Sequence, residues 1–228
     1  TPPEYGVTAT DRWIRELGKV LHKEEEVEKI IAEKHAETEP QLEKYRKEFA
    51  GKTAYVAAGA AHGHAIIALL GELGFKVEGA SIFHHDPLYD NEDPRSDALA
   101  QAVEVYGDVP GYRVCNKQAF ELVNAFNRIK PDIIIARHSG MTAWAAKLGI
   151  PSLLIGDEQF GFGYEGVLRY AKRIEETLDA VEFVTNLSKH VDIPYTDWWL
   201  QQEPGYYVKK SAEIQKLKEQ KREKAVDE

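Results

Sequence analysis

The first fifty residues carry hydrophobic positions at the spacing of amphipathic helices. Thr10 or Asp11 can cap the first of these helices. Because proline fits the first turn of a helix but not its interior, Pro40 is expected to divide the stretch into two helices. Residues 1–50 are therefore predicted to form an N-terminal helical segment. The apolar positions on one face of its first helix are Trp13, Ile14, Leu17 and Leu21.

From residue 51 the pattern changes to short apolar runs that alternate with helical spacing. The predicted strands are 52–58, 75–83, 112–116, 131–138 and 150–157, and the predicted helices are 64–73, 96–106, 119–129, 142–149 and 163–180. Strands joined through helices need right-handed crossovers, so the sheet is expected to be parallel and covered on both faces. Residues 51–195 are thus predicted to form a Rossmann-like, doubly wound α/β domain with a mostly parallel five-stranded sheet.

The last part of the chain, residues 196–228, has a different composition. It begins with aromatic residues in an irregular pattern and ends with mostly Lys, Glu and Gln. This composition predicts an aromatic and charged tail that is either a solvated helix or disordered.

Charge and composition exclude several classes of protein. The chain has 228 residues, 43% of them hydrophobic, and a net charge of -9. Because binding to phosphate backbones depends on clustered Lys and Arg, this acidic balance argues against a nucleic-acid partner. The sequence shows neither a membrane-spanning run nor a secretory signal, so we expect a cytoplasmic protein with no membrane partner.

Cysteine and methionine usage add two expectations. Cys115 is the only cysteine, which excludes a disulfide framework and any iron–sulfur cluster held by this chain's thiolates alone. The chain begins at Thr1 and its only methionine is Met141. We therefore expect it to be a piece of a longer polypeptide.

Histidines gather where a parallel sheet of this kind binds ligands. Ligands lie outside the carboxyl ends of the strands, where the strand order reverses. Five of the eight histidines follow or end predicted strands at that edge: His62, His64, His84, His85 and His138. Polar residues that join them there are Asp86, Arg137, Asp157 and Glu158.

Each histidine also has a structural interpretation. His64 can simply face the first helix, His84 and His85 can shape the turn that follows them, and His138 can pair with a carboxylate. The clustering favours a shared site, because loops at this edge are where function usually resides.

The glycines after the first predicted strand match no nucleotide motif. Gly59 and Gly63 are four residues apart, which fits neither GxGxxG nor GxxxxGK[ST]. Gly59 still lets backbone N–H groups approach an anion at a helix start. Ser139 stands in HSG and not in the GxSxG of hydrolases, whereas two histidines and a carboxylate from neighbouring loops can bind a metal. The site is expected to suit an anion or a metal.

Several segments in order resemble the carboxyl-terminal domain of the alpha subunit of nitrogenase component 1 and its relatives. They cover about residues 6 to 190 and include GVTATDRWIRELGKVL, EKIIAEKHAETEPQLEKYRKEFAGK, NRIKPDIII, KLGIPSLLI and GYEGVLRYAKRIEETL. The resemblance implies three Rossmann-like domains around an iron–sulfur-based metal cofactor, a beta-type subunit, and an ATP-dependent iron protein as electron donor. The domains amino-terminal to this one would be further partners.

The resemblance also implies which residues face the cofactor. In the family, the glycine-rich segment after this domain's first strand lies against it. The matching residues here are Gly59, Ala60, Ala61, His62, Gly63 and His64. His64 falls where family members often have histidine, and Ala61 replaces the family's typical arginine. We expect the wall to be completed by His84, His85, Asp86, His138, Asp157 and Glu158.

One departure limits the expected activity. Nitrogenase has a cofactor-ligating histidine just before the segment matched by 163–166, whereas GDEQFGF at 156–162 has none. The sequence therefore predicts a domain of a nitrogenase-like oxidoreductase that does not reduce dinitrogen, is inactive alone and retains no cofactor by itself. The alternatives are a cofactor-assembly scaffold, a metal-binding module without catalysis, or a simple metal-dependent enzyme that uses His62, His64 and a carboxylate.

Overall fold

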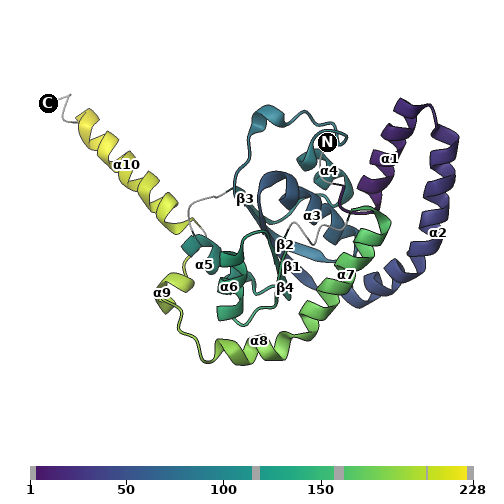
Figure 1. Ribbon diagram of the computed structural model, residues 1–228. Coiled ribbons are helices and arrows are strands. Elements are labelled where there is room, and N and C mark those ends of the chain that lie inside the picture. Colours follow the sequence, from purple (N-terminus) through teal and green to yellow (C-terminus); the bar gives the residue numbers. More distant parts are fainter. Residues whose placement is uncertain (1–3, 115–118, 157–161, 204, 225–228) are drawn as a thin grey trace.

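The computed structural model of the protein describes residues 4–114, 119–156, 162–203 and 205–224 (Figure 1). The strands are β1 Thr53–Ala58, β2 Lys76–Ile82, β3 Gly111–Val114, β4 Ile133–Ala136 and β5 Ser152–Leu154. The helices before β4 are α1 Val7–Leu21, α2 Glu24–Phe49, α3 Ala60–Glu72, α4 Ala98–Val105 and α5 Ala119–Ile129, with a 3-10 turn, η1, at Pro87–Tyr89. Those after β4 are α6 Ser139–Lys147, α7 Gly163–Asp179, α8 Val181–Ser188, α9 Asp197–Leu200 and α10 Tyr206–Lys224.

The five strands form one parallel sheet in the order β3-β2-β1-β4-β5. In the central pairs, Ala54 lies opposite Val77 of β2 and Ile133 of β4. The strand order reverses between β1 and β4, because the chain winds outward from β1 in one direction and from β4 in the other. The prediction of a doubly wound, Rossmann-like sheet is confirmed.

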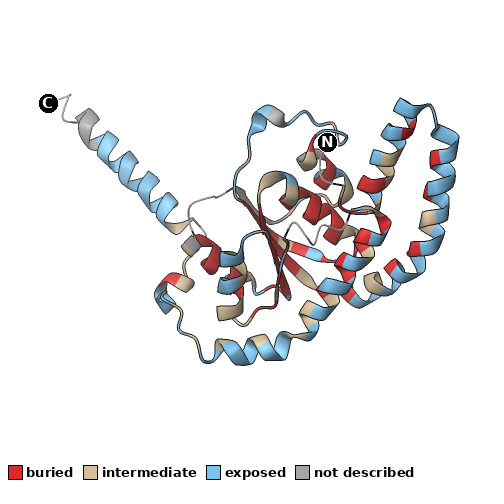
Figure 2. Cartoon of the chain, viewed as in Figure 1, coloured by how far each residue is buried: buried red, intermediate tan, exposed pale blue. Residues whose placement is uncertain are grey.

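The sheet separates two hydrophobic cores. Alternate strand residues point to opposite faces, so Ala54, Val56 and Ala58 join one core while Tyr55 and Ala57 join the other. The first core packs against α2, α3 and α7, and the second against α5 and α6. Figure 2 shows this burial concentrated in the strands and in α3. The apolar runs of the sequence are continuous because both faces of the strands are covered.

The amino-terminal helices form a hairpin, and the predicted break at Pro40 is wrong. Pro40 lies inside α2, whose buried positions, including Val27 and Leu42, continue on both sides of it. The chain instead reverses at His22, which adopts a left-handed conformation with φ 55°. Gly18 permits the close packing there, because a Cβ on it would lie 2.7 Å from Cγ2 of Val27. Helix packing has overridden the preference of proline.

Helix α3 begins earlier than predicted. The sequence favours a helix from His64, but the structure starts it at Ala60, and the first helical bond runs from the N–H of Gly63 to the carbonyl of Gly59 at 2.7 Å. The residues expected to form a loop are therefore the first turn of a helix. Small alanine side chains suit that turn, and alanine is the strongest helix former.

The carboxyl-terminal third wraps around the sheet. Helices α7 and α8 run along one end of the molecule, and the chain then turns back to α9, which packs on α5 (Figure 1). Helix α10 projects from the body and is exposed over its described side chains beyond Tyr206 (Figure 2). Of the two outcomes expected for the tail, the structure shows the solvated helix. Within the described ranges, no helix combines the length and the apolar character that crossing a membrane requires.

Candidate functional site at the carboxyl edge of the sheet

Three helices begin next to one another at the carboxyl edge of the sheet, and within the described part of the chain none of them is capped by the side chain of its N-cap residue. Helices α3, α6 and α7 follow β1, β4 and β5, which are adjacent strands. Their N-cap residues, Gly59, His138 and Phe162, make no capping hydrogen bond through a side chain. The first N–H groups of a helix lack partners inside it, and its dipole is positive there. This edge therefore favours an anionic group.

The imidazole of His84 lies directly over the start of α3. A Cβ added to Gly59 would lie 3.1 Å from Cε1 of His84, so a larger residue at this position would push the ring away. His84 is itself exposed. The geometry brings one exposed imidazole to an uncapped helix N-terminus.

His62 faces the amino-terminal lead-in. Its Nδ1 lies 3.1 Å from the hydroxyl of Tyr5, whose ring stacks on Phe162 with centroids 5.7 Å apart. Tyr5 is only 1% exposed, so this contact is fixed by the first core. His62 is thus joined to the start of α7 through an aromatic pair.

His64 points to the other side of α3, because two residues in a helix are separated by about 200° of rotation. It is buried, its Nε2 lies 2.9 Å from the hydroxyl of Tyr112, and its ring is perpendicular to that of His85 at 5.5 Å. Burial, and then the charge of His85, lowers the pKa of His64 from 6.5 to about 4. His64 is therefore neutral at neutral pH and is not part of an exposed wall.

His85 and Asp86 have partners within their own loop. Nε2 of His85 lies 2.8 Å from Oδ2 of Asp90. Asp86 caps η1, since its carboxylate accepts a hydrogen bond from the N–H of Leu88 at 3.0 Å. Asp97 holds the loop further.

Asp97 connects this loop to α4. Its Oδ1 accepts the N–H groups of Leu99 and Ala100, and its Oδ2 accepts those of Asn91 and Glu92. Burial by itself would raise the pKa of the Asp97 carboxyl, but these four backbone donors lower it below its ordinary value. A buried carboxylate therefore joins the acidic loop to the start of α4.

Residues after β4 complete the described part of the edge. His138 is exposed and its ring lies 5.1 Å from that of Phe83. The guanidinium of the preceding Arg137 lies 3.5 Å from the carbonyl of Ile155. Nearby, the buried hydroxyl of Tyr170 has no hydrogen-bond partner among the residues that the structure describes. Burial raises the pKa of Tyr170 well above its ordinary value, with Tyr5 adding to the shift and Arg137 opposing it.

The predicted histidines therefore reach the same edge but do not form one cluster. His62, His84 and His138 lie near uncapped helix starts, whereas His64 and His85 form a separate pair beside Tyr112. Among the described residues, no three His, Cys, Asp or Glu side chains come together as a metal site. Asp157 and Glu158 lie outside the described residues.

Aromatic residues at this edge were missed by sequence reasoning. Tyr5, Tyr112, Phe162 and Tyr170 contact or surround the histidines, yet they occupy four separate segments of the chain. Tyr112 stands in a predicted strand, and nothing in its spacing indicates a bond to His64. Their positions follow from the strand order and not from any local motif.

Comparison with known proteins gives a family. The model for the nitrogenase component 1 type oxidoreductases matches residues 2–179. Over 86 residues the chain is 36% identical to the nitrogenase molybdenum-iron protein alpha chain of Methanosarcina barkeri. The aligned segment covers 36% of this chain and 16% of that one. The alpha chain of the same name from Methanothermobacter thermautotrophicus is 27% identical to this chain over 174 residues. That alignment covers 74% of this chain and 34% of the relative.

Solved structures show the same fold. Nitrogenase Cp1 at pH 6.5 superposes with a TM-score of 0.60 and 16% identity, covering 85% of this chain and 46% of that one. The structure of Cp1 at pH 5 gives a TM-score of 0.59 and 19% identity, covering 85% and 43%. The chain thus spans about a third or less of the two curated relatives and less than half of these solved chains.

Proposed function

Because this chain belongs to the nitrogenase component 1 type oxidoreductases, we propose that the carboxyl edge of its sheet forms part of the wall around a metal–sulfur cofactor. The observation that carries the proposal is the row of uncapped helix starts after β1, β4 and β5. Sulfide-based clusters carry negative charge, and backbone N–H groups at helix starts stabilise negative charge.

The residues at this edge are suited to contacting such a cofactor. They do not supply a complete set of metal ligands within the described part of the chain. The exposed imidazoles of His84 and His138 can donate or accept hydrogen bonds at this edge. The unpaired hydroxyl of Tyr170 is a buried polar group that calls for a partner such as an ordered water. Within the described ranges no three His, Cys, Asp or Glu side chains come together, so this edge is proposed to contact the cofactor and not to hold it by itself. When bound, the cofactor supplies the redox chemistry.

The proposed roles of this chain's residues are electrostatic and positional. The N–H groups at the start of α3 would stabilise anionic charge, and the close contact of His84 with Gly59 would hold the imidazole beside them. His62 would be kept in place by Tyr5. His64 and His85 would support this wall from behind, since His64 is buried.

The partners are proposed from the family as well. Further domains of the same polypeptide, a beta-type subunit and an ATP-dependent iron protein would complete the enzyme, and the domain is proposed to be inactive without them. Reduction of dinitrogen is not proposed, because residues 156–162 contain no histidine where nitrogenase has its cofactor ligand. The same absence favours the second candidate, a cofactor-assembly scaffold.

The test is anaerobic expression of the complete reading frame with its beta-type partner, followed by analysis of iron and acid-labile sulfide. We expect bound iron, and we expect His84→Ala to lower the iron content or change the electron paramagnetic resonance signal. His190→Ala, at an exposed histidine away from this edge, is the matched control. An iron-free complex would contradict the proposal.

Turnover separates the two candidate functions. A nitrogenase-like oxidoreductase should consume electrons from the iron protein in an ATP-dependent reaction without forming ammonia from dinitrogen. A scaffold should bind the cofactor and show no such turnover. Ammonia formation would overturn the proposal that dinitrogen is not the substrate.

A further inference from the structure

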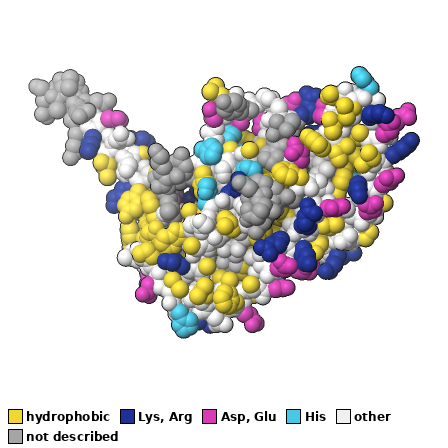
Figure 3. All heavy atoms as spheres, viewed as in Figure 1, with side chains coloured by type: hydrophobic (Ala, Val, Ile, Leu, Met, Phe, Trp, Pro, Cys, Tyr) yellow, Lys and Arg dark blue, Asp and Glu magenta, His cyan; other side chains and the backbone are white. Residues whose placement is uncertain are grey.

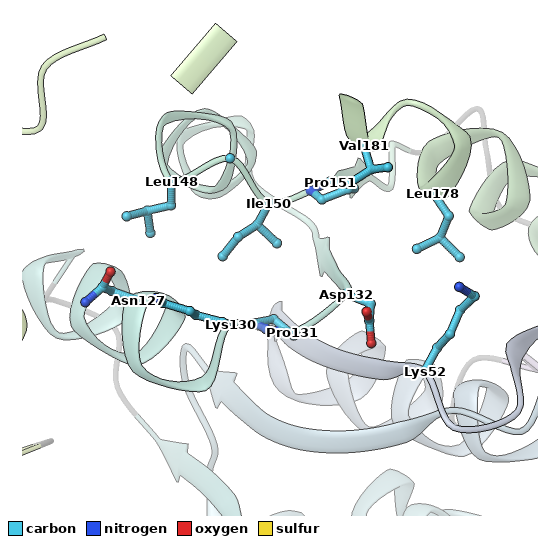
Figure 4. Close-up of a pocket in the computed structure, with 11 residues that line it drawn as sticks. Lys52, Asn127, Lys130, Pro131, Asp132, Leu148, Ile150, Pro151, Leu178 and Val181 are labelled. Atoms are coloured by element: carbon cyan, nitrogen blue, oxygen red, sulfur yellow. The ribbon is translucent and has the colours of Figure 1, made fainter. Parts of the chain in front are cut away.

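A cavity of about 400 Å³ lies at the amino edge of the sheet, opposite the candidate site (Figure 4). Its floor is formed where β1, β4 and β5 begin, at Lys52, Asp132 and Pro151. Its other sides come from the ends of α5, α6 and α7 and the start of α8. Two sequence segments that the proposed function does not use, NRIKPDIII and KLGIPSLLI, therefore meet in this cavity.

The local sequence fixes the shape of the cavity. Helix α5 ends at Ile129, and the next residue, Lys130, adopts a left-handed conformation with φ 47° and donates its N–H to the carbonyl of Phe126. Helix α6 ends at Lys147 and is followed by Gly149 with φ 75°, where a Cβ would lie 2.9 Å from Oγ of Ser188 on α8. Pro131 and Pro151 follow these two helix ends and lack the N–H that a further helical hydrogen bond would need. The cavity is bounded by rigid turns.

The walls combine apolar side chains with a few polar and charged ones. Leu148, Ile150 and Pro151 lie on the side of α6, and Leu178 and Val181 on the side of α7 and α8. Figure 4 shows Leu148 and Ile150 lying together, with Leu178 on the other side of the cavity. Cavities of about 300–1,000 Å³ with apolar walls and a few polar groups are typical of small-molecule sites.

The charged groups favour an anion. Neither Lys52 nor Lys130 forms an ion pair within the described part of the chain. Asp132 is already engaged, because its Oδ2 accepts the N–H of Thr53 at 2.6 Å and the hydroxyl of Thr53 at 2.7 Å. Figure 4 shows the Lys52 side chain extending toward Leu178, so its ammonium lies against an apolar wall.

The helix ends that face this cavity carry partial negative charge, and some of their terminal carbonyl groups accept backbone hydrogen bonds. Carbonyls at the end of α6 accept the N–H groups of Leu148, Gly149 and Ile150, and that of Phe126 in α5 accepts the N–H of Lys130. These bonds satisfy groups that would otherwise attract a cation. Two lysines against one engaged carboxylate leave the lining with a positive charge.

We propose that this cavity binds a short aliphatic monocarboxylate. Its carboxylate would pair with the Lys52 ammonium, and its alkyl chain would pack between Leu148, Ile150 and Leu178. The site is independent of the cofactor wall, since the two lie at opposite ends of the strands.

Hexanoate is a suitable probe, with hexylamine and 1-hexanol as probes of equal chain length but different charge. Titration of the 228-residue chain, followed by amide chemical shifts in nuclear magnetic resonance, should show saturable changes at Lys52, Gly149 and Ile150 with hexanoate. Lys52→Gln should weaken hexanoate binding by about tenfold, as expected for the loss of one charge-assisted contact. Lys29→Gln, at an exposed lysine on α2, should leave it unchanged.

Leu178→Glu is a second variant that places a negative charge in the cavity, and it should abolish hexanoate binding. Circular dichroism and thermal unfolding of each variant check that the fold is kept. The proposal is overturned if hexanoate shifts no lining amide, if hexylamine or hexanol binds as tightly, or if Lys29→Gln weakens binding as much as Lys52→Gln.

Discussion

Nε2 of His64 lies 2.9 Å from the hydroxyl of Tyr112, and this contact joins α3 to β3 across 48 positions of sequence. The two rings are almost parallel, with 16° between their planes. Burial raises the pKa of the Tyr112 hydroxyl, with Asp90 adding to the shift, just as burial lowers that of His64. Both groups are therefore held neutral in the folded protein.

This pair predicts that stability falls in mild acid. The pKa of His64 is about 4 in the folded state and near 6.5 in the unfolded state, so between these pH values only the unfolded chain binds the proton. Above about pH 6.5, His64 is neutral in both states and costs no stability. As pH falls from 6.5 toward 4, the free energy of unfolding decreases by up to about 3 kcal/mol. His64→Gln should reduce the loss of unfolding free energy between pH 6.5 and 4.

Urea unfolding at a series of pH values measures this effect. The groups that face His64 are His85, Asp90, Asp97 and Tyr112, so the comparison must be between variants at the same pH. His190→Gln, at an exposed histidine, should keep the wild-type pH dependence. An unchanged profile for His64→Gln would show that the imidazole does not carry the effect.

Gly111 is predicted to tolerate no side chain. A Cβ there would lie 2.7 Å from the carbonyl oxygen of Glu78. This oxygen belongs to the backbone of β2 and cannot move without disturbing the pairing of β2 with β3. Gly111→Ala should lower the free energy of unfolding by about 1–3 kcal/mol. Gly140→Ala, where nothing lies within 4 Å, should leave stability unchanged or raise it by up to about 1 kcal/mol. Equal effects in the two variants would refute this account of the β2–β3 register.

A hydrogen bond from Tyr164 to Asp11 ties the amino-terminal hairpin to α7. The hydroxyl lies 2.6 Å from Oδ1, and Nε2 of His35 lies 2.9 Å from the same oxygen. Tyr164→Phe should cost about 1–2 kcal/mol of unfolding free energy, because a bond to a charged, partly buried acceptor is lost. Tyr45→Phe is the control, since its hydroxyl makes no hydrogen bond within the described ranges. An equal loss of unfolding free energy in Tyr45→Phe would mean that the hydrogen bond from Tyr164 to Asp11 makes no specific contribution to stability.

Asp97 is predicted to control the order of the loop before α4. Asp97→Ala removes the acceptor of four backbone N–H groups, including the cap of α4, and should cost about 2 kcal/mol. Hydrogen exchange should become faster at Asn91, Glu92, Leu99 and Ala100. Asp108→Ala, at an exposed aspartate, should not change exchange at these amides. Slow exchange in Asp97→Ala would argue that other contacts hold the loop.

Much of the fold could be predicted from local patterns. Apolar runs such as IIIA in β4 predict buried strands, and the intervening helices require parallel crossovers. The family resemblance is confirmed by the match over residues 2–179. Local patterns failed at Pro40 and at the start of α3, because packing along α2 and the helix preference of alanine outweighed the signals at those positions.

The sequence by itself placed five histidines at the carboxyl edge of the sheet, since residues that follow parallel strands must share an edge. Only the tertiary structure decided that His64 is buried against Tyr112, that His84 covers Gly59, and that His62 meets Tyr5. Strand order brings these partners together over 48 or 57 positions of sequence, and no local periodicity encodes such contacts. Edge position is a property of local pattern, whereas burial and partners follow from how the layers pack.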